Sequence, residues 1–183
     1  MGILKYILTQ NIYGLHQKAG SKNIAEYHGA IKKLRCIECS RRYTPDEFDL
    51  EALKASKKLP PVCNCGGIIK DDGVFFGEPI PNDVRKLSEQ QALTCDLMMI
   101  CGTSAVVQPF ASLPLLAKYE ENRSVFGVML TGNLLKKKVV IIEINAEPTP
   151  LTNSVSDYLI QGKTGDILPQ IVEEINTYLK GTA

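Results

Sequence analysis

The run Leu97-Met98-Met99-Ile100-Cys101, followed at once by Gly102-Thr103-Ser104, indicates the class of fold. A continuous apolar run without polar alternation is typical of a parallel strand that is covered on both faces. The segment 139–144, Val-Val-Ile-Ile-Glu-Ile, is a second run of this kind. Further strands are expected at 3–9, at 158–160 and, more weakly, at 125–130.

Helical patterns separate these strands. Val84, Leu87 and Ala92 mark one helix after Pro81, and residues 113–119 begin another with a proline in the first turn. The last helix has the clearest i, i+3, i+4 spacing and can end at Gly181; its apolar positions are Leu168, Ile171, Val172, Ile175, Tyr178 and Leu179. Strands that alternate with helices predict an α/β fold built on a parallel sheet.

Length and composition narrow the class of protein. The chain has 183 residues, 44% of them apolar, and a formal charge of +1 from 21 basic and 20 acidic residues. This is a soluble globular composition, long enough for one domain and a small insert. A nucleic-acid partner is not expected without a clustered basic face. The sequence contains neither an apolar run of about 18 residues nor an export signal, so we expect no membrane span and a cytoplasmic location.

Four cysteines form two close pairs, Cys36-x-x-Cys39 and Cys63-Asn64-Cys65, the second followed by Gly66-Gly67. Zinc binds four such thiolates in a tetrahedron when two short turns face each other, and a closed site of this kind is structural. Disulfides are not expected in a chain without an export signal. Buried free thiols would explain Cys95 and Cys101 but do not account for two tight pairs. We therefore predict one structural zinc ion, with free thiols as the alternative.

Residues 32–71 are interpreted as a zinc-binding insert in the α/β domain. Thr44-Pro45-Asp46-Glu47 is a capping box that predicts a small helix, which Leu59-Pro60-Pro61 would stop. The insert has too few apolar residues for a core of its own, so the metal would supply much of its folding free energy. Residues 1–31 and 72–183 would form the surrounding Rossmann-like domain.

The ends of the predicted strands carry residues suited to a ligand. The strands end in Thr9-Gln10-Asn11, Gly102-Thr103-Ser104 and Asn145-Ala146-Glu147. Open parallel sheets bind ligands beyond the carboxyl ends of their strands, so these groups could contact a nucleotide, although strand ends are often polar because they meet turns. His28, before Gly29, is a candidate general base, and a turn histidine is the alternative.

An ordered set of motifs in this chain resembles the sirtuin family, the NAD-dependent protein lysine deacylases. The resemblance runs from about residue 7 to the C-terminus. Its motifs are Thr9-Gln10-Asn11-Ile12, His28-Gly29, the cysteine pairs, Phe76-Gly77-Glu78, Gly102-Thr103-Ser104 with Val107 and Pro109, and Ile144-Asn145.

The resemblance implies a role for each matching residue. His28 and Asn11 would be catalytic, with His28 acting as a base toward the ribose. The NAD-binding residues would be Gln10, Asn11, Ile12, Gly102, Thr103, Ser104, Asn145, Glu147 and Thr164. An acylated lysine peptide would be clamped by β-addition between Val74, Phe76, Gly77 and Val107. The structural zinc ligands would be Cys36, Cys39, Cys63 and Cys65.

Three departures from the family pattern qualify this expectation. Tyr13 stands where the family has an aspartate that helps to hold and expel nicotinamide, and Asp71-Asp72-Gly73-Val74 replaces Pro-Asp-Val-Val. The family's Gly-Ala-Gly-Ile-Ser segment and first strand would lie upstream of residue 1. The expected Rossmann-like sheet is therefore incomplete. Losing two or three phosphate hydrogen bonds would weaken NAD binding by roughly 10²- to 10⁵-fold, and an exposed sheet would favour self-association.

These features leave more than one functional hypothesis. The first is an NAD-dependent protein deacylase whose start codon is mis-assigned or whose chain is truncated. The second is a catalytically inactive, sirtuin-like protein that keeps the zinc insert and binds peptides. The third, a zinc-ribbon module that touches nucleic acid, is disfavoured by the near-neutral charge.

Overall fold

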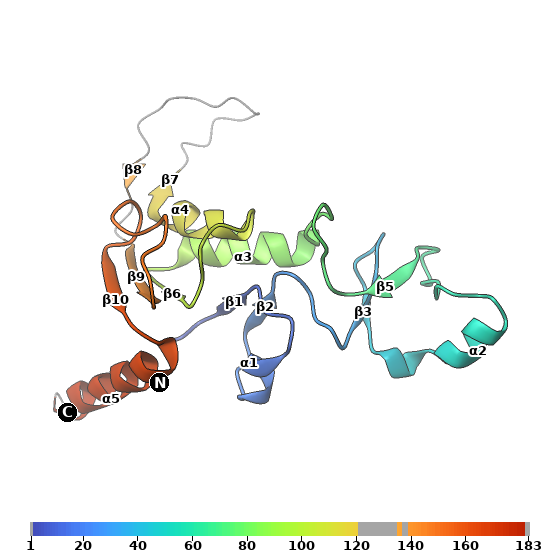
Figure 1. Cartoon of the computed structure of the whole chain (residues 1–183), viewed down its shortest axis with the longest axis horizontal. Helices are drawn as coiled ribbons and strands as arrows, with labels where there is room; N and C mark the ends of the chain where they lie inside the picture. The colour runs from blue at the N-terminus through green and yellow to red at the C-terminus, as the bar shows by residue number, and fades with distance from the viewer. Residues whose placement is uncertain (1, 121–134, 137–138, 182–183) are drawn as a thin grey trace. The chain divides into compact units, whose positions relative to one another are not determined.

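The structure, a computed structural model, describes residues 2–120, 135–136 and 139–181. The chain divides into two compact units, Met1–Gln90 and Gln91–Ala183, and each is described by itself (Figure 1). Helix α3 (Asn82–Thr94) runs from the first unit into the second, as the pattern after Pro81 predicts.

The first unit begins with a parallel pair of strands. β1 (Ile7–Thr9) pairs with β2 (Ile24–Glu26), and the short helix α1 (Leu15–Lys18) lies between them in the sequence. The strand predicted over 3–9 is therefore regular only at its end. Pairing starts where the N–H of Ile7 donates to Asn23 O at 2.9 Å, and residues 3 and 4 are largely exposed.

An antiparallel sheet in the order β4-β3-β5 forms the rest of this unit's regular strand structure. It consists of β3 (Leu34–Cys36), β4 (Arg42–Tyr43) and β5 (Ile69–Asp71). The helix predicted after the capping box is split into the 3₁₀ turn η1 (Pro45–Glu47) and α2 (Leu50–Ala55). The split arises because Asp49 accepts the N–H of Ala52 at 2.9 Å and so caps a new helix start.

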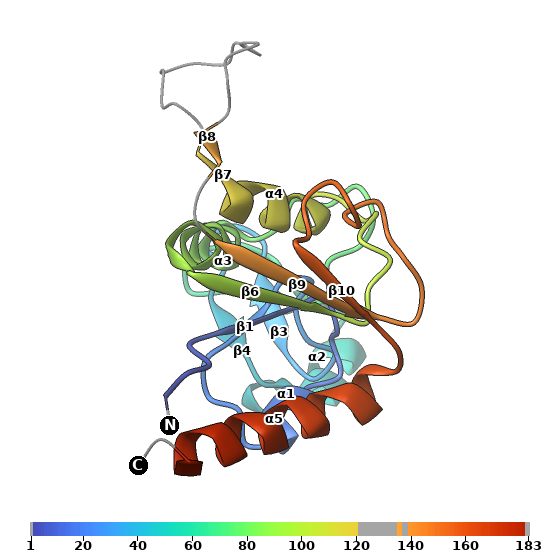
Figure 2. The same cartoon turned by 90° about the vertical axis from the view of Figure 1, so that its left-hand side faces the viewer.

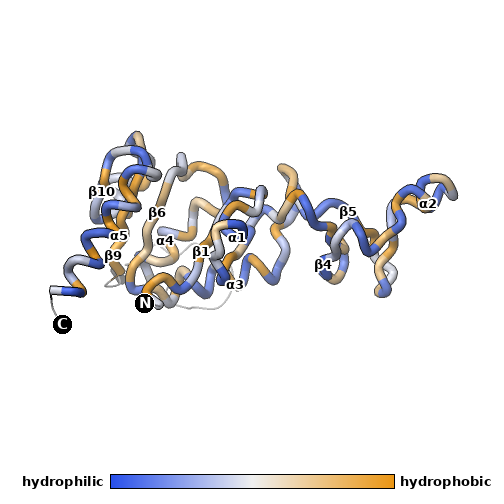
Figure 3. Tube along the Cα trace, turned by 90° about the horizontal axis from the view of Figure 1, so that it is seen from below, coloured by the Kyte–Doolittle hydropathy of each residue, from blue (hydrophilic) through white to orange (hydrophobic). Residues whose placement is uncertain are grey.

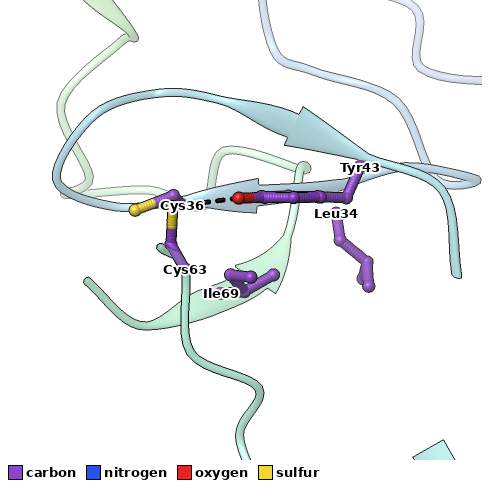
Figure 4. Close-up of a cluster of buried hydrophobic side chains, with 5 residues drawn as sticks. All are labelled: Leu34, Cys36, Tyr43, Cys63 and Ile69. Atoms are coloured by element: carbon purple, nitrogen blue, oxygen red, sulfur yellow. Dashed lines mark hydrogen bonds between the residues drawn. The ribbon is translucent and has the colours of Figure 1, made fainter. Parts of the chain in front are cut away.

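The core of this sheet is small and surrounds two of the cysteines. Its buried residues are Leu34, Cys36, Tyr43, Cys63 and Ile69 (Figure 4). The ring of Phe48 packs against them. The small size of this core agrees with the interpretation that residues 32–71 contain few apolar residues.

The second unit contains the parallel sheet that the apolar runs predict. Its order is β10-β9-β6, with β6 (Leu97–Cys101), β9 (Val140–Asn145) and β10 (Tyr158–Gln161). The turn η2 (Phe110–Ser112) leads into α4 (Leu113–Lys118), and the chain ends with α5 (Thr164–Gly181). α4 and α5 lie on opposite sides of the sheet (Figure 2). β7 (Tyr119–Glu120) pairs antiparallel with β8 (Leu135–Lys136). The strand expected at 125–130 lies outside the described residues.

One face of this parallel sheet is largely exposed, which differs from the expected covering on both faces. The residues on it alternate along the strands and oppose one another in the register. Five of them are 37–62% exposed: Leu97, Met99, Val140, Tyr158 and Ile160. The apolar positions of α5, which alternate with polar ones (Figure 3), are also poorly buried in the described structure.

Side-chain hydrogen bonds and an ion pair hold the loop that follows β9. The carboxylate of Glu143, fully buried in β9, accepts hydrogen bonds from the hydroxyls of Thr152 at 2.7 Å and Ser156 at 3.1 Å. Asp157, at the end of the same loop, accepts the N–H of Ile141 at 2.9 Å and pairs with the buried ammonium of Lys118. The loop 146–157 is therefore fastened to the sheet at its middle, through Thr152, and at its C-terminal end, through Ser156 and Asp157.

Within the described part of the chain, no helix combines the length and the apolar character needed to cross a lipid bilayer.

Candidate functional site

The four predicted metal ligands lie together. The Sγ atoms of Cys36, Cys39, Cys63 and Cys65 are all within 4.8 Å of one another. The sulfurs of Cys36 and Cys65 are 3.5 Å apart, and those of Cys39 and Cys63 are 3.6 Å apart. Zn–S bonds of about 2.3 Å in a tetrahedron place sulfurs about 3.8 Å apart. The cluster therefore has the ligand number, chemistry and spacing of one structural zinc site.

Hydrogen bonds bring the two cysteine turns together and bind their sulfurs. The N–H of Ile37, in the first turn, donates to Ile68 O, beyond the second turn, at 3.0 Å. The backbone N–H of Cys65 and the hydroxyl of Tyr43 lower the pKa of the Cys63 thiol to about 6. Donation to sulfur raises the pKa of Tyr43 to about 12. These donors stabilise the thiolate, which is the form that ligates a metal.

Gly67 is required by a close approach. A Cβ atom at this position would lie 2.6 Å from the sulfur of Cys36 and 2.7 Å from Cγ of Glu38. Gly66 has a φ of +87°, which glycine adopts without strain, and donates its N–H to Cys63 O at 2.8 Å. The geometry of the metal site thus explains why glycine occupies both positions after the second cysteine pair.

The first unit also brings His28 next to Gln10, Asn11 and Ile12. The parallel pairing continues past the strands, since the N–H of Tyr27 donates to Thr9 O at 2.8 Å and the N–H of Ile31 donates to Ile12 O at 3.1 Å. Burial lowers the pKa of His28, and a hydrogen bond to the backbone of Gln10 offsets part of this effect. A neutral imidazole can accept a proton, which is the protonation state that a general base needs.

One of the predicted peptide-binding residues is joined to this histidine. The N–H of Val74 donates to His28 O at 3.0 Å. Phe76 is 97% exposed at the tip of the same segment, and Gly77 has a φ of +86°. The fourth residue of that prediction, Val107, belongs to the second unit, where its carbonyl accepts the N–H of Ala111 at 3.0 Å.

The second unit gathers the other predicted NAD-binding residues around a hollow. It has a volume of about 380 Å³, and its lining includes Gly102, Thr103, Ser104, Asn145 and Glu147. The side-chain amide of Asn145 donates to Thr103 O at 3.0 Å and to Glu147 O at 2.9 Å, which joins the two strand ends. A Cβ at Gly102 would lie 3.4 Å from the hydroxyl of Thr164, so the start of α5 adjoins this hollow.

Some residues of these sites are not predicted from the sequence. Pro148, Thr149 and Pro150 complete the lining of the hollow, and the only signal for them is that they follow Asn145-Ala146-Glu147. Tyr43 at the metal cluster has no distinctive motif. It remains a prediction that Gln10, Asn11 and Ile12 of the first unit bind the same NAD molecule as the residues around the hollow of the second unit.

The comparison with protein families decides the assignment. The sequence model described as the Sir2 family matches residues 1–109. The chain belongs to the Sir2 family. This family is the sirtuin family that the ordered motifs resemble, so that prediction is confirmed.

Curated Sir2 relatives cover almost all of the chain. It is 36% identical over 181 residues to NAD-dependent protein deacylase 2 of Pyrobaculum aerophilum, with 98% of this chain and 63% of that protein covered. It is 38% identical to an NAD-dependent protein deacetylase of Saccharolobus solfataricus, with 96% and 62% covered. The chain therefore spans less than two thirds of the length of these relatives.

Solved Sir2 structures have the same fold. The structure of Sir2Af2 bound to a myristoylated histone peptide matches with a TM-score of 0.69 and 37% identity, over 99% of this chain and 69% of that one. The α/β class with a parallel sheet and a zinc-binding cysteine cluster is thus confirmed.

Proposed function

We propose that this chain is an NAD-dependent protein lysine deacylase. It would transfer the acyl group of an acyl-lysine to the ADP-ribose that NAD supplies, with release of nicotinamide. The observation that carries the proposal is the position of His28: a partly buried histidine of lowered pKa beside Gln10, Asn11 and Ile12, in a chain of the Sir2 family. The curated relatives, which are named as deacylases or deacetylases, support the same reaction.

The proposed roles are those that the resemblance to the family implies, and each unit brings its own set of these residues together. His28 accepts a proton from the ribose, and Asn11 beside it is the second catalytic residue. Gln10, Asn11 and Ile12 hold the nicotinamide-ribose end of NAD. The adenosine end is held by Gly102, Thr103, Ser104, Asn145, Glu147 and Thr164, which line or adjoin the hollow of the second unit.

An acylated lysine peptide is the proposed substrate. Val74, Phe76, Gly77 and Val107 are the residues proposed to contact it. The exposure of Phe75 and Phe76, 66% and 97%, supports binding of an extended peptide along this segment. The fully exposed ring of Phe76 would become covered when such a peptide binds.

The metal cluster is proposed to be structural. Cys36, Cys39, Cys63 and Cys65 offer four ligands and so complete a zinc tetrahedron, which leaves no coordination position for a substrate. We propose residues 32–71 as the zinc module and residues 1–31 with 72–183 as the NAD-binding domain. The β4-β3-β5 sheet and both cysteine turns fall within the proposed module.

We also propose that the chain associates with itself through the exposed face of the β10-β9-β6 sheet. The support is the row of apolar side chains that includes Leu97, Met99 and Tyr158. Large exposed apolar patches mark interaction surfaces in soluble proteins.

The experiment that tests the deacylase is nicotinamide release from NAD, measured with an acetyl-lysine peptide and with the same peptide unacetylated. Release should require the acetyl group and fall by about 10²- to 10⁴-fold in His28→Ala. His16→Ala is the matched control, because His16 is the other histidine of the chain. Equal release with the two peptides, or from the two histidine variants, would refute the proposal.

A second candidate is a peptide-binding protein without catalytic activity. It is favoured by Tyr13, which is 60% exposed at the position of the family's aspartate. Binding of the acetylated peptide without any turnover of NAD would select this candidate over the deacylase.

A further inference from the structure

Asp72 is a buried carboxylate that joins two parts of the first unit. It follows β5 directly and is only 1% exposed. A buried ionised group is tolerated when opposite charges and hydrogen-bond donors surround it. The groups that surround Asp72 come from two sides: from the β4-β3-β5 sheet that carries the cysteine turns, and from the turn that carries His28.

On the side of the metal cluster, two arginines contact Asp72. The Nε of Arg35 lies 3.1 Å from its Oδ1 atom, and the Nε of Arg42 lies 3.4 Å from the same atom. Arg35 immediately precedes the ligand Cys36 on β3, and its side chain is 7% exposed. The N–H of Asp72 also donates to Lys33 O at 3.0 Å. The carboxylate is thus held to the strand that ends in a metal ligand.

On the side of His28, the same residue contacts the turn that follows. The N–H of Ala30 donates to Oδ2 of Asp72 at 3.2 Å. Gly29 has a φ of +75°, and a Cβ there would lie 2.0 Å from the carbonyl oxygen of Asp72. Two residues further on, the N–H of Val74 donates to His28 O. Residues 28–30 therefore lie directly against residues 72–74, without room for a side chain at position 29.

We propose that Asp72 is a positioning residue that couples the metal cluster to the His28 turn. Its carboxylate binds Arg35 and Arg42 with one oxygen and the Ala30 amide with the other, so a shift of β3 on metal loss moves residues 28–30. The catalytic consequence rests on the proposed role of His28. The coupling itself concerns the positions of residues 28–30 and is measurable without activity.

The chemistry of the site requires a carboxylate. An ionised aspartate has only acceptors, which suits the guanidinium groups and the amide that face it. Asparagine has the same shape but directs an NH₂ group toward one of these donors. Asp72→Asn should therefore release the Ala30 amide and speed its hydrogen exchange by about 10- to 100-fold, the range expected for a lost hydrogen bond to a charged acceptor.

The decisive comparison uses two glycines of similar backbone conformation. Gly29→Ala places a methyl group against the Asp72 carbonyl, whereas at Gly20, with a φ of +84°, an added Cβ would have nothing within 4 Å. Both variants carry the same kind of backbone strain. We expect the His28 ring resonance in proton NMR to move, and kcat for nicotinamide release to fall at unchanged KM for NAD, in Gly29→Ala alone. Because the chain has two histidines, His16→Asn assigns the resonances.

Metal removal provides a test without substitution. Zinc is extracted from the full chain with a chelator, and amide exchange is followed at Gly29 and Ala30. We expect exchange there to accelerate while the amides of β9, in the other unit, remain protected. Unchanged exchange at Gly29 and Ala30 after metal loss, or equal effects of Gly29→Ala and Gly20→Ala on His28, would overturn the coupling. If the wild-type chain releases no nicotinamide, the deacylase proposal fails. Amide hydrogen exchange and NMR still test the coupling through Asp72 in that case.

Discussion

The hydroxyl of Tyr43 lies 2.9 Å from the sulfur of Cys63, and both side chains are buried. The tyrosine ring is held in place by an edge contact with Phe48 at 5.3 Å and by the guanidinium of Arg41, which lies 5.3 Å from the ring centre. The position of the donor is therefore set by ring packing as well as by its contact with the sulfur. Partners that orient a metal ligand contribute to affinity as the ligands themselves do.

Removing this hydroxyl should weaken zinc binding. Tyr43→Phe keeps the ring and its contact with Phe48 and deletes only the donor to Cys63. We expect the zinc dissociation constant, measured by competition with a chromogenic chelator, to rise by about 10- to 100-fold. Tyr158→Phe, at an exposed position, is the matched control and should bind zinc normally. Equal affinities of the two variants would show that the contact does not support the metal site.

A methyl group at Gly67 should disturb the same cluster by crowding. The added Cβ would lie 2.6 Å from Cys36 Sγ, closer than the two atoms can approach. Gly67→Ala is expected to hold zinc more weakly than the wild type and to lose it earlier in a chelator titration. Gly165→Ala adds the same atom where nothing lies within 4 Å, and its zinc content should remain stoichiometric. A Gly67→Ala protein with full zinc affinity would contradict the described packing.

The lowered pKa of His28 predicts how stability depends on pH. Burial disfavours the protonated ring in the folded chain, so the unfolded chain binds more protons below its ordinary pKa of about 6.5. Stability should fall as pH drops through about 6.5 and stop falling below the folded pKa. Urea unfolding at a series of pH values should show a smaller acid loss in His28→Asn than in the wild type. Parallel curves for the two proteins would contradict the shift.

An acid at position 13 should increase activity if the chain is a deacylase. The family has an aspartate where this chain has Tyr13, whose side chain is exposed and can be replaced without disturbing a core. We expect Tyr13→Asp to raise the rate of nicotinamide release by about 10- to 100-fold, the value of one charge-assisted hydrogen bond. Tyr13→Asn, which has the same size but no charge, is the control. An equal gain in both variants would exclude a role for the charge.

The exposed sheet face should control self-association. Met99→Lys places a charge on β6 within the apolar face that β6, β9 and β10 form, and it should shift sedimentation toward the monomer. Leu15→Lys removes an exposed apolar side chain from α1, outside that face, and should leave the association unchanged; Leu15 is 61% exposed and Met99 38%. A wild-type chain that sediments as a monomer at all concentrations would contradict the proposal.

The sequence allowed prediction wherever a local pattern determined the structure. The apolar runs at 97–101 and 139–144 predicted parallel strands, and the paired spacing of the cysteines predicted the metal cluster. The prediction that both faces of the sheet are covered was wrong for one face, because a run of apolar residues does not specify which element packs against it. Residues 125–130 lie outside the described structure, so that predicted strand stays untested.

The role of Asp72 could not be read from the sequence for a different reason. Its two main side-chain contacts are to Ala30 and Arg35, which are 42 and 37 positions away in the chain. Both depend on the antiparallel pairing of β3 with β5, which no local motif specifies. At the sequence level, Asp72 was visible only as the aspartate that the departing stretch Asp71-Asp72-Gly73-Val74 keeps from the family's Pro-Asp-Val-Val.

The bonds from Glu143 to Thr152 and Ser156 have a consequence for ligand affinity. The loop they fasten contributes Pro148, Thr149 and Pro150 to the hollow, so this wall exists before anything enters. A molecule that binds there does not have to freeze a moving segment, and the entropy lost on association is correspondingly smaller. Glu143, which is not part of the lining, would thereby favour the binding of such a molecule, because it orders one wall of the hollow during folding.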